Sequence, residues 1–462
     1  MKNNSGFFKE AIVKTAMPIT LQSLFQASFG VVDQIMTGQL GSVAVAGIGL
    51  GGKFASLFSV VAAAVATGAG ILMSQYLGVV EKSQEGKRNV AGSFWLNLLS
   101  GGLIAIIFTL LGTVAAGTVM SLYSTDQPAI AASAAYLRII AIGFLPAMVS
   151  LMVSTCLRCH GYAKFPLYAT VASAVVNTGL NYMLIFGKLG APELGMEGAA
   201  YATTAARFVE LVLLILFMGR LMKRRVLSLP LVVKMDAGFY TVCAKILLPL
   251  LGCEFLWSVG ENVYAMIYGR MSTEACAAMT LTGPVQALMI GALTGVAQAA
   301  GIMVGRELGK GEAERAYDIS KKFVSYGLMA SLGLSTILIL LSGFYVKMFE
   351  VEPEIQKMTA YILYVYALIA PVKVQNMILG GGVLRSGGKT GYMMAVDAIG
   401  TWGFGVPLGL LASYGLGLPI HLVYLMLSLE EIVRLLICIW MFRKRIWMAE
   451  LKVDAGTQTV NA

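Results

Sequence analysis

The sequence predicts an all-α integral membrane protein of twelve transmembrane helices, arranged as two six-helix bundles related by a pseudo-twofold axis along the membrane normal. Its composition is the first reason, because 58% of the 462 residues are hydrophobic and only 13% are charged. A soluble domain carries about 25% charged residues, so lipid is the expected surrounding of this chain. Apolar runs of about 20 residues, the length of a membrane-spanning helix, recur from end to end. The third reason is that the second half repeats the first.

The apolar runs between polar breaks give twelve predicted spans. They fall near residues 14–38, 46–77, 90–122, 129–157, 165–187, 196–222, 240–269, 277–308, 319–348, 355–384, 391–414 and 418–441. Several runs are longer than the ~20 residues that cross a bilayer, so we expect these helices to tilt or to extend beyond it.

The basic residues predict how the chain is oriented. With the N-terminus inside, 24 of the 34 Lys and Arg residues fall in inside segments, and only Lys188, Arg270, Lys347 and Lys357 fall outside. Lys and Arg accumulate in cytoplasmic loops, so we expect a multi-pass protein of the bacterial plasma membrane with both termini in the cytoplasm. The net charge of +10 then follows from topology. Nucleic acid is not an expected partner, because the basic residues do not form one patch.

The two halves of the sequence match at fixed shifts. A shift of 231 aligns Pro18 with Pro249, Gly38 with Gly269, Gly70 with Gly301 and Leu77-Gly78 with Leu308-Gly309, and a shift of 227 aligns Leu157-Arg158 with Leu384-Arg385. Six helices per half is an even number, so both halves cross the membrane in the same direction, which is a known plan of transporters. We therefore expect an N-terminal bundle over 1–225, a cytoplasmic linker over 226–239, and a C-terminal bundle with a short tail over 240–462.

The stretch "TCLRCH" at 155–160 contains C-x-x-C-H, the pattern that attaches c-type haem. Only two histidines are present in the whole chain, too few for a typical set of membrane haem ligands. "LRCHG" at 157–161 also occupies the place of "LRSGG" at 384–388 in the repeat. We therefore interpret the stretch as a cytoplasmic turn with Arg158 as a topology anchor, and we expect no haem and no structural metal there.

Four stretches resemble one family of transporters. They are "FGVVDQIMTGQLG" (29–41), "MIYGRMSTEACAAM" (266–279), "LRSGGK" (384–389) and "DAIGTWGFGVPLG" (397–409), and they look like segments of the MATE family of multidrug and toxin extrusion transporters. The similarity runs from about Lys9 to Arg445. It implies a secondary active antiporter, not an enzyme, that exports organic cations in exchange for H+ or Na+ by alternating access. The implied partners are cationic amphiphiles and membrane lipids, with no cofactor beyond the coupling ion, and the expected state is a monomer.

Acidic residues inside the spans are the candidate functional groups, because a charge at mid-bilayer costs at least ~2.5 kcal/mol. The seven within the predicted spans are Asp33, Glu210, Glu254, Glu261, Asp397, Glu430 and Glu431.

Asp33 has no basic residue within one helical turn, and the resemblance places the acid that takes the coupling ion at this position. Asn177 and Asn181 are one turn apart and share a helix face. The resemblance puts them beside Asp33, together with oxygens from Ala199 and Thr203, although interhelical hydrogen bonding is an equally ordinary role for two asparagines. Several oxygen ligands suit a hard cation. Asn181 stands where the family often has Asp, so one negative charge is missing and H+ is favoured over Na+.

The second half supplies candidates for binding the substrate or a proton. Glu254 and Glu261 are two turns apart on one face, and Tyr264 and Tyr268 follow at helical spacing. An acid with aromatic neighbours suits an organic cation through charge and cation–π attraction. Asp397 in the eleventh span is similar to the family's second-half pattern and is a further candidate.

A structural role is the alternative for each of these acids, since buried acids are commonly paired. Lys245 or Lys373 could pair with the two span 7 glutamates, and Lys389 or Arg385 could pair with Asp397. Ion pairs within one helix are the expected role of the remaining acids, with Glu430 and Glu431 close to Arg434 and Glu210 close to Arg207.

A lipid-linked oligosaccharide flippase of a related family is the alternative function, because it shares this helix plan. A cavity that handles lipid phosphates should be basic. The predicted spans contain Lys53, Arg138, Arg207, Lys245, Lys373 and Arg434, which keeps this alternative open. No Gly-rich nucleotide loop with its Lys-Ser/Thr appears, so direct use of ATP is not expected.

Overall fold

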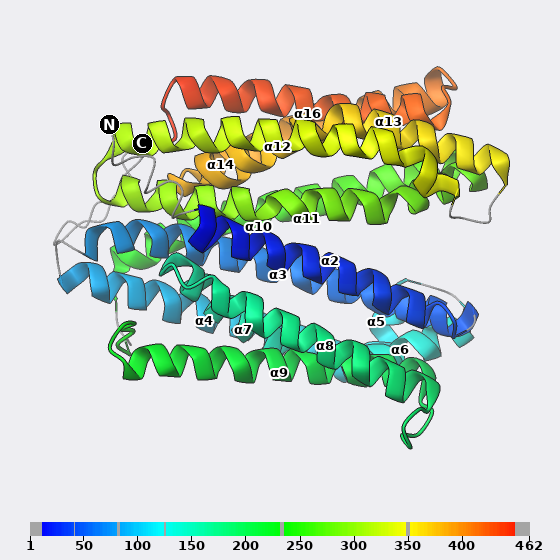
Figure 1. The fold of residues 1–462 in the computed structure, drawn as a ribbon, viewed down its shortest axis with the longest axis horizontal. Coiled ribbons are helices and arrows are strands. Elements are labelled where there is room, and N and C mark those ends of the chain that lie inside the picture. The colour runs from blue at the N-terminus through cyan, green and yellow to red at the C-terminus, as the bar shows by residue number, and fades with distance from the viewer. Residues whose placement is uncertain are drawn as a thin grey trace. The chain divides into compact units, whose positions relative to one another are not determined.

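The computed structural model describes residues 12–40, 42–80, 84–123, 126–231, 235–347 and 352–448. Over these ranges every regular element is a helix, and no strand occurs (Figure 1). The predicted all-α fold is therefore confirmed. Each of the twelve predicted spans overlaps a helical segment.

The chain divides into two compact units, which we describe separately. Unit 1 consists of Met1–Thr20, Ser74–Val79 and Asp236–Ala462, and unit 2 of Leu21–Met73 and Val80–Met235. Two short segments of the first half, including one end of a long helix, thus belong with the second half. The predicted linker at 226–239 contains the point at which unit 2 ends.

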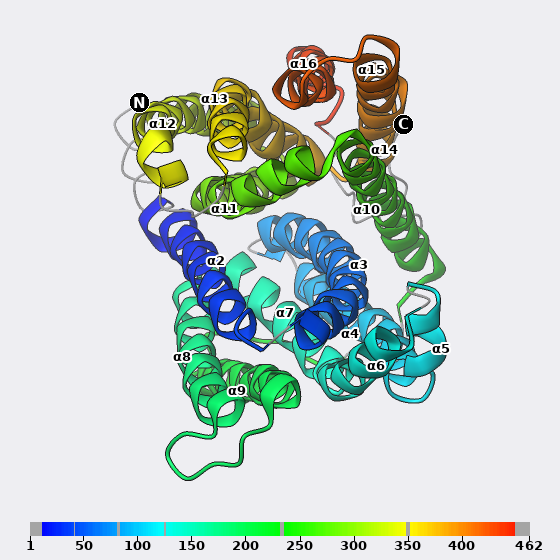
Figure 2. The same cartoon turned by 90° about the vertical axis from the view of Figure 1, so that its right-hand side faces the viewer.

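Unit 2 is a bundle of eight helical segments. They are α2 (Met17–Thr37), α3 (Ser42–Val80), α4 (Gln84–Thr113), α5 (Ala116–Ser121), α6 (Gln127–Ala141), α7 (Phe144–Cys159), α8 (Lys164–Phe186) and α9 (Gly195–Lys223). Helices α8 and α9 lie side by side, as both views show (Figures 1 and 2). Helices α6 and α7 form one predicted span that is bent by 45° at residues 142–143. Gly143 lies at this bend, and glycine is a common site of helix kinks.

Unit 1 contains long helices and several π-helical turns. After η1 (Ile12–Ala16) its elements are α10 (Ala237–Met271), α11 (Thr273–Gly309), α12 (Ala313–Lys347), α13 (Pro353–Asn376), η2 (Met377–Leu384), α14 (Thr390–Ala398), η3 (Ile399–Gly405), α15 (Val406–Leu410), η4 (Leu411–Gly415) and α16 (Ile420–Arg443). Helix α13 lies between α12 and α16, and α14 packs on α10 (Figure 2). One span, α13–η2, ends in π-helix. Another span, from α14 to η4, alternates between α-helix and π-helix. Such turns are rare and often mark functional sites.

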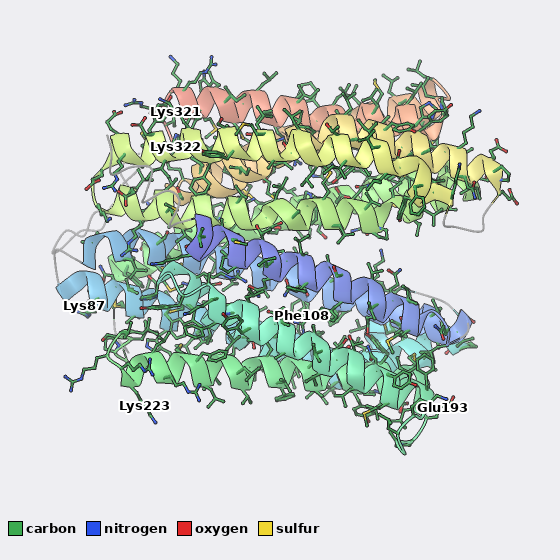
Figure 3. All side chains as sticks on the ribbon, in the orientation of Figure 1. Lys87, Phe108, Glu193, Lys223, Lys321 and Lys322 are labelled. Atoms are coloured by element: carbon green, nitrogen blue, oxygen red, sulfur yellow. The ribbon has the colours of Figure 1, made fainter. Side chains whose placement is uncertain are left out.

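Many of the helices are suited to a membrane. Within the described residues, eight are long and apolar enough to cross one, and the bent α6–α7 pair makes nine. Helices α2, α9 and α16 overlap the three remaining predicted spans. In unit 2, Lys87 and Lys223 lie at one end of the helices and Glu193 at the other, as the alternation of the spans requires (Figure 3).

The internal repeat is visible in two turns. Gly161 follows α7 with a φ of +83°, and Gly388 follows η2 with a φ of +75°. Both glycines come three residues after an arginine, and this left-handed backbone is open to glycine at low cost. The chain does turn here, but residues 155–159 of the predicted turn belong to the end of α7, and the turn itself lies at 160–161. Cys156 and Cys159 are buried thiols, and His160 Nδ1 lies 2.8 Å from the Cys156 carbonyl oxygen within the same helix end. Among the described residues no cluster of metal ligands includes them.

Close packing at Gly309 generates a test of the unit 1 fold. A Cβ atom at this position would lie 1.9 Å from the carbonyl oxygen of Gln75, so a methyl group forces two backbones apart. We expect Gly309→Ala to destabilise the protein by about 1–3 kcal/mol, the usual cost of overpacking. Thermal unfolding of the detergent-purified protein, followed by tryptophan fluorescence, measures this. Gly333→Ala is the control, because no atom lies within 4 Å of a Cβ there. Equal unfolding temperatures for the two variants would contradict the packing.

Candidate functional site

A polar cluster in unit 2 joins three helices. Asn181 Nδ2 of α8 donates to Asp33 Oδ1 of α2 at 2.5 Å and to Asn177 Oδ1 at 3.3 Å. Asn177 Nδ2 in turn donates to Thr203 Oγ1 of α9 at 3.4 Å. Four of the five residues predicted for the coupling ion are thus linked by hydrogen bonds, and we call these four the Asp33 cluster. The fifth, Ala199, lies one turn before Thr203 on α9 and is 2% exposed.

Asp33 is a carboxylate that accepts a hydrogen bond from an amide. Among the described residues no Lys or Arg forms an ion pair with it, and its side chain is only partly exposed. Asn181, which holds it, is fully buried. The end of α2 is ordered next to the acid, since the Thr37 hydroxyl donates to the Asp33 carbonyl oxygen at 2.9 Å. A bond from an amide to a charged carboxylate is stronger than a neutral one, so the protonation state of Asp33 affects how α2 is attached to α8.

The orientation of the Asn181 amide decides which oxygens of the cluster are available to a cation. Asn181 presents its amide nitrogen to both neighbouring side chains, so it acts as a donor. Its oxygen is buried without a hydrogen-bond partner among the described residues. Oxygens from Asp33, Asn177 and Thr203 could hold Na+ only if the Asn181 amide turned to face them with its oxygen. A proton needs no such rearrangement, because the carboxylate of Asp33 keeps a second oxygen free of the Asn181 bond.

A second polar layer lies deeper in unit 2. Arg158 Nη2 donates to Gln22 Oε1 at 2.8 Å, and Gln22 Nε2 donates to Thr170 Oγ1 at 2.7 Å. Thr170 donates to Glu210 Oε1 at 2.9 Å, and Arg207 lies 3.6 Å from the same carboxylate. The predicted pair of Arg207 and Glu210 is thus confirmed. Arg158 was predicted as a topology anchor, and the structure adds that its guanidinium group also reaches the buried Gln22.

Helices α8 and α9 are joined by a ladder of three hydrogen bonds between these two layers. The rungs are Asn177 to Thr203 at 3.4 Å, Ser173 to the Ala206 carbonyl at 2.9 Å, and Thr170 to Glu210 at 2.9 Å. Helix α2 contacts the ladder at both ends, through Asp33 and through Gln22, which are three turns apart. That spacing places both side chains on one face of α2. Gln22 was not predicted as a site residue, and this spacing from Asp33 is the signal in the sequence that could have identified it.

Unit 1 contains a cavity of about 420 Å³ between α10, α11, α13, η2, α14 and α16. Glu254, Glu261 and Asp397 line it, as the two-turn spacing of the first two predicts. The two tyrosines predicted with them are not among the lining residues. Tyr264 donates from its hydroxyl to Glu430 Oε2 at 2.6 Å, and Tyr268 packs against the apolar core.

Ion pairs connect most of the charges around this cavity. Arg385 lies 3.3 Å from Glu254 and 3.6 Å from Asp397, so the structural alternative for Asp397 holds with Arg385. Arg434 lies 3.8 Å from Asp397 and 3.6 Å from Glu430, and the latter is the predicted pair within α16. Its guanidinium also donates to the Thr401 hydroxyl. The two arginines therefore bridge three carboxylates from three helices.

In the described part of the chain, Lys373 of α13 forms fewer ion pairs than the two arginines. Its ammonium lies 3.8 Å from Glu431 Oε1, so Glu431 pairs across helices and not with Arg434. Asn376 donates to the other oxygen of Glu431 at 2.8 Å. Glu261 lines the same cavity, and its charge interacts with that of Lys373, but no ion pair within 4 Å reaches it among the described residues.

Comparison with known proteins places this geometry in a family. The sequence model of the family described as MatE matches residues 18–183 and 249–411, one range in each half. Transporter YisQ of Bacillus subtilis, which is described as uncharacterized, is 22% identical over 435 residues and 93% of both chains. The probable multidrug resistance protein NorM of Streptococcus pneumoniae is 24% identical over 427 residues, 89% of this chain and 91% of the relative.

Solved structures show the same fold. An outward-facing multidrug resistance transporter of the MATE family superposes with a TM-score of 0.83 at 17% identity, over 94% of this chain and 95% of that one. A transporter of the MOP superfamily from Pyrococcus furiosus has a TM-score of 0.85 at 16% identity over the same shares.

The deeper polar layer of unit 2 generates a second test. Gln22→Leu removes the acceptor of the Arg158 guanidinium and the donor to Thr170, so two hydrogen bonds of the buried layer are lost. We expect a loss of about 2 kcal/mol in the free energy of unfolding, because a hydrogen bond contributes about 1 kcal/mol and one to a charged group contributes more. Chemical unfolding in detergent measures the change. Gln34→Leu, an exposed glutamine on the same helix, is the control. A Gln22→Leu variant as stable as Gln34→Leu would show that the layer does not hold α2.

Proposed function

Since this chain belongs to the MatE family, we propose that it is a secondary active antiporter that exports small organic cations in exchange for protons. It is a membrane transporter by family, and its relatives NorM of Streptococcus pneumoniae and MdtK of Yersinia enterocolitica are named as multidrug resistance proteins. The antiport mechanism, the proton as coupling ion and the cationic substrate go beyond the family assignment and are our proposal.

The bond between Asn181 and Asp33 is the observation that carries the proposal. A charged Asp33 accepts a strong bond from the buried amide, and this bond ties α2 to the α8–α9 ladder. Protonation removes the charge and weakens the bond. Binding of a proton from outside would thus favour a different position of α2, and its release inside would restore the first. A change of this kind couples proton movement to alternating access, because each state of α2 binds the proton with a different affinity.

The charges of the unit 1 cavity favour a cationic substrate over a lipid phosphate. Arg385, Arg434 and Lys373 each form at least one ion pair, so every base among the described lining residues has an acidic partner. Of the lining acids, Glu261 forms no ion pair within the described part of the chain. This balance supports export of cations and speaks against the alternative of a flippase.

Neutralising Asp33 should abolish coupling. We expect Asp33→Asn to lower the uptake of ethidium into inverted membrane vesicles with an acidic interior by at least about tenfold, because the variant cannot take up a proton. Asp318→Asn, an exposed acid in an ion pair with Lys321, should transport as the parent does. Equal amounts of folded protein in each vesicle preparation are verified first. If Asp33→Asn transports as well as the parent, the coupling proposal fails.

A second carboxylate in the cluster should change the coupling ion. Asn181→Asp places another acid opposite Asp33 and replaces an amide donor with oxygen ligands, which suits Na+. We expect the variant to show ethidium uptake that an imposed Na+ gradient stimulates severalfold, whereas the parent responds to the H+ gradient alone. Asn262→Asp, at an exposed site on α10, is the control. Strong Na+ stimulation of the parent would contradict the assignment of the proton.

A further inference from the structure

The three basic side chains of the unit 1 cavity are held in different ways. Arg385 and Arg434 each contact two carboxylates, which fixes them between helices. Lys373 contacts one carboxylate at 3.8 Å, and it is the most exposed of the three, with 25% of its side chain accessible against 16% and 10% for the arginines. A lysine ammonium is a point charge on a flexible stem, whereas a guanidinium forms a rigid fork. Lys373 is therefore the base that can move.

Glu431, the ion-pair partner of Lys373, also accepts hydrogen bonds from Asn376. Asn376 Nδ2 donates to Glu431 at 2.8 Å and to the Glu431 carbonyl oxygen at 2.7 Å, so Glu431 keeps a hydrogen bond if the ammonium leaves. Glu261 lies in the same cavity without an ion pair among the described residues. The charge of Lys373 thus interacts with two lining carboxylates, Glu431 and Glu261, but forms an ion pair within 4 Å only with Glu431.

The other walls of the cavity suit an organic cation. Trp257 and Tyr366 supply aromatic faces, and Met377 and Met393 supply adaptable apolar surface. The volume of about 420 Å³ falls in the range of small-molecule sites. A cation drawn to Glu261 and Glu431, however, meets the charge of Lys373 at the same place.

We propose that Lys373 is a tethered competitor, which occupies the acidic part of the unit 1 cavity and has to swing away from Glu431 before a substrate cation binds there. The inference rests on the proposed function for the class of substrate, but it concerns binding and not transport. Repulsion between two like charges a few ångströms apart in a protein lowers affinity by orders of magnitude. The ammonium therefore keeps the affinity of the cavity for cations low. Weak and readily reversed binding is what an exporter needs in order to release its substrate.

Binding of tetraphenylphosphonium to the purified full-length protein in detergent tests the proposal. We expect Lys373→Met, which removes the charge and keeps the length of the side chain, to lower the Kd at least about tenfold. Lys373→Arg keeps the positive charge and should show no such gain in affinity. Adding Glu261→Gln to Lys373→Met should reverse most of the gain. Lys245→Met, on an exposed lysine of α10 that does not line the cavity, is the matched control.

A neutral probe shows whether the gain in affinity comes from removing the charge of Lys373 or from the space that the substitution opens. Triphenylphosphine oxide should gain little affinity from Lys373→Met, because it has no charge to repel. Lys373→Gln, a polar neutral replacement, provides the same comparison if the methionine variant does not fold. The proposal is overturned if neither neutral variant binds tetraphenylphosphonium more tightly than the parent, or if the neutral probe gains as much. Failure of gradient-driven uptake with the binding gain intact would instead count against the proposed antiport, because this measurement uses no gradient and leaves Asp33 unchanged.

Discussion

The cost of placing a charge in lipid governs this molecule. An ionised group at the bilayer centre costs several kcal/mol unless it finds a partner, so each acid in a span either joins a network or has a reason to stay apart. Arg385 and Arg434 meet this requirement in unit 1 by bridging acids from α10, α14 and α16. Asp33 and Glu261 stand outside these ion pairs. We therefore propose these two acids, which lie outside the ion pairs of the described residues, as the places where a proton and a cation bind.

The same constraint determines how helices are held together. Lipid gives no hydrophobic drive for helix association, so packing and hydrogen bonds take its place. In unit 2 the α8–α9 ladder serves this purpose, and α2 is attached to it at Gln22 and Asp33. One attachment depends on amide and hydroxyl groups, and the other on a carboxylate that titrates. A helix with one permanent and one titratable attachment can respond to a proton without leaving its bundle.

The pattern of apolar residues along the sequence predicted where the helices are, but it did not predict where they bend or change to π-helix. Apolar runs of bilayer length predict a helix because the backbone in lipid has to satisfy its own hydrogen bonds. The bend between α6 and α7 and the π-helical turns of α13–η2 and α14–η4 were not predicted, since apolar composition is the same on both sides of each break. Helical spacing correctly placed Asn177 beside Asn181 and Glu254 with Glu261, because that spacing depends on one helix alone.

Partners across helices could be found only in the folded chain. The sequence by itself determined the all-α membrane fold, the repeat and the acids that deserve a role, because hydropathy, charge and periodicity are properties of the chain. The tertiary structure decided that Arg158 reaches Gln22, that Glu431 pairs with Lys373, and that Tyr264 binds Glu430 instead of lining the cavity. These pairs join residues between 58 and 166 positions apart. Only the packing of helices brings such groups together, and a charge in lipid takes whichever partner that packing places within reach.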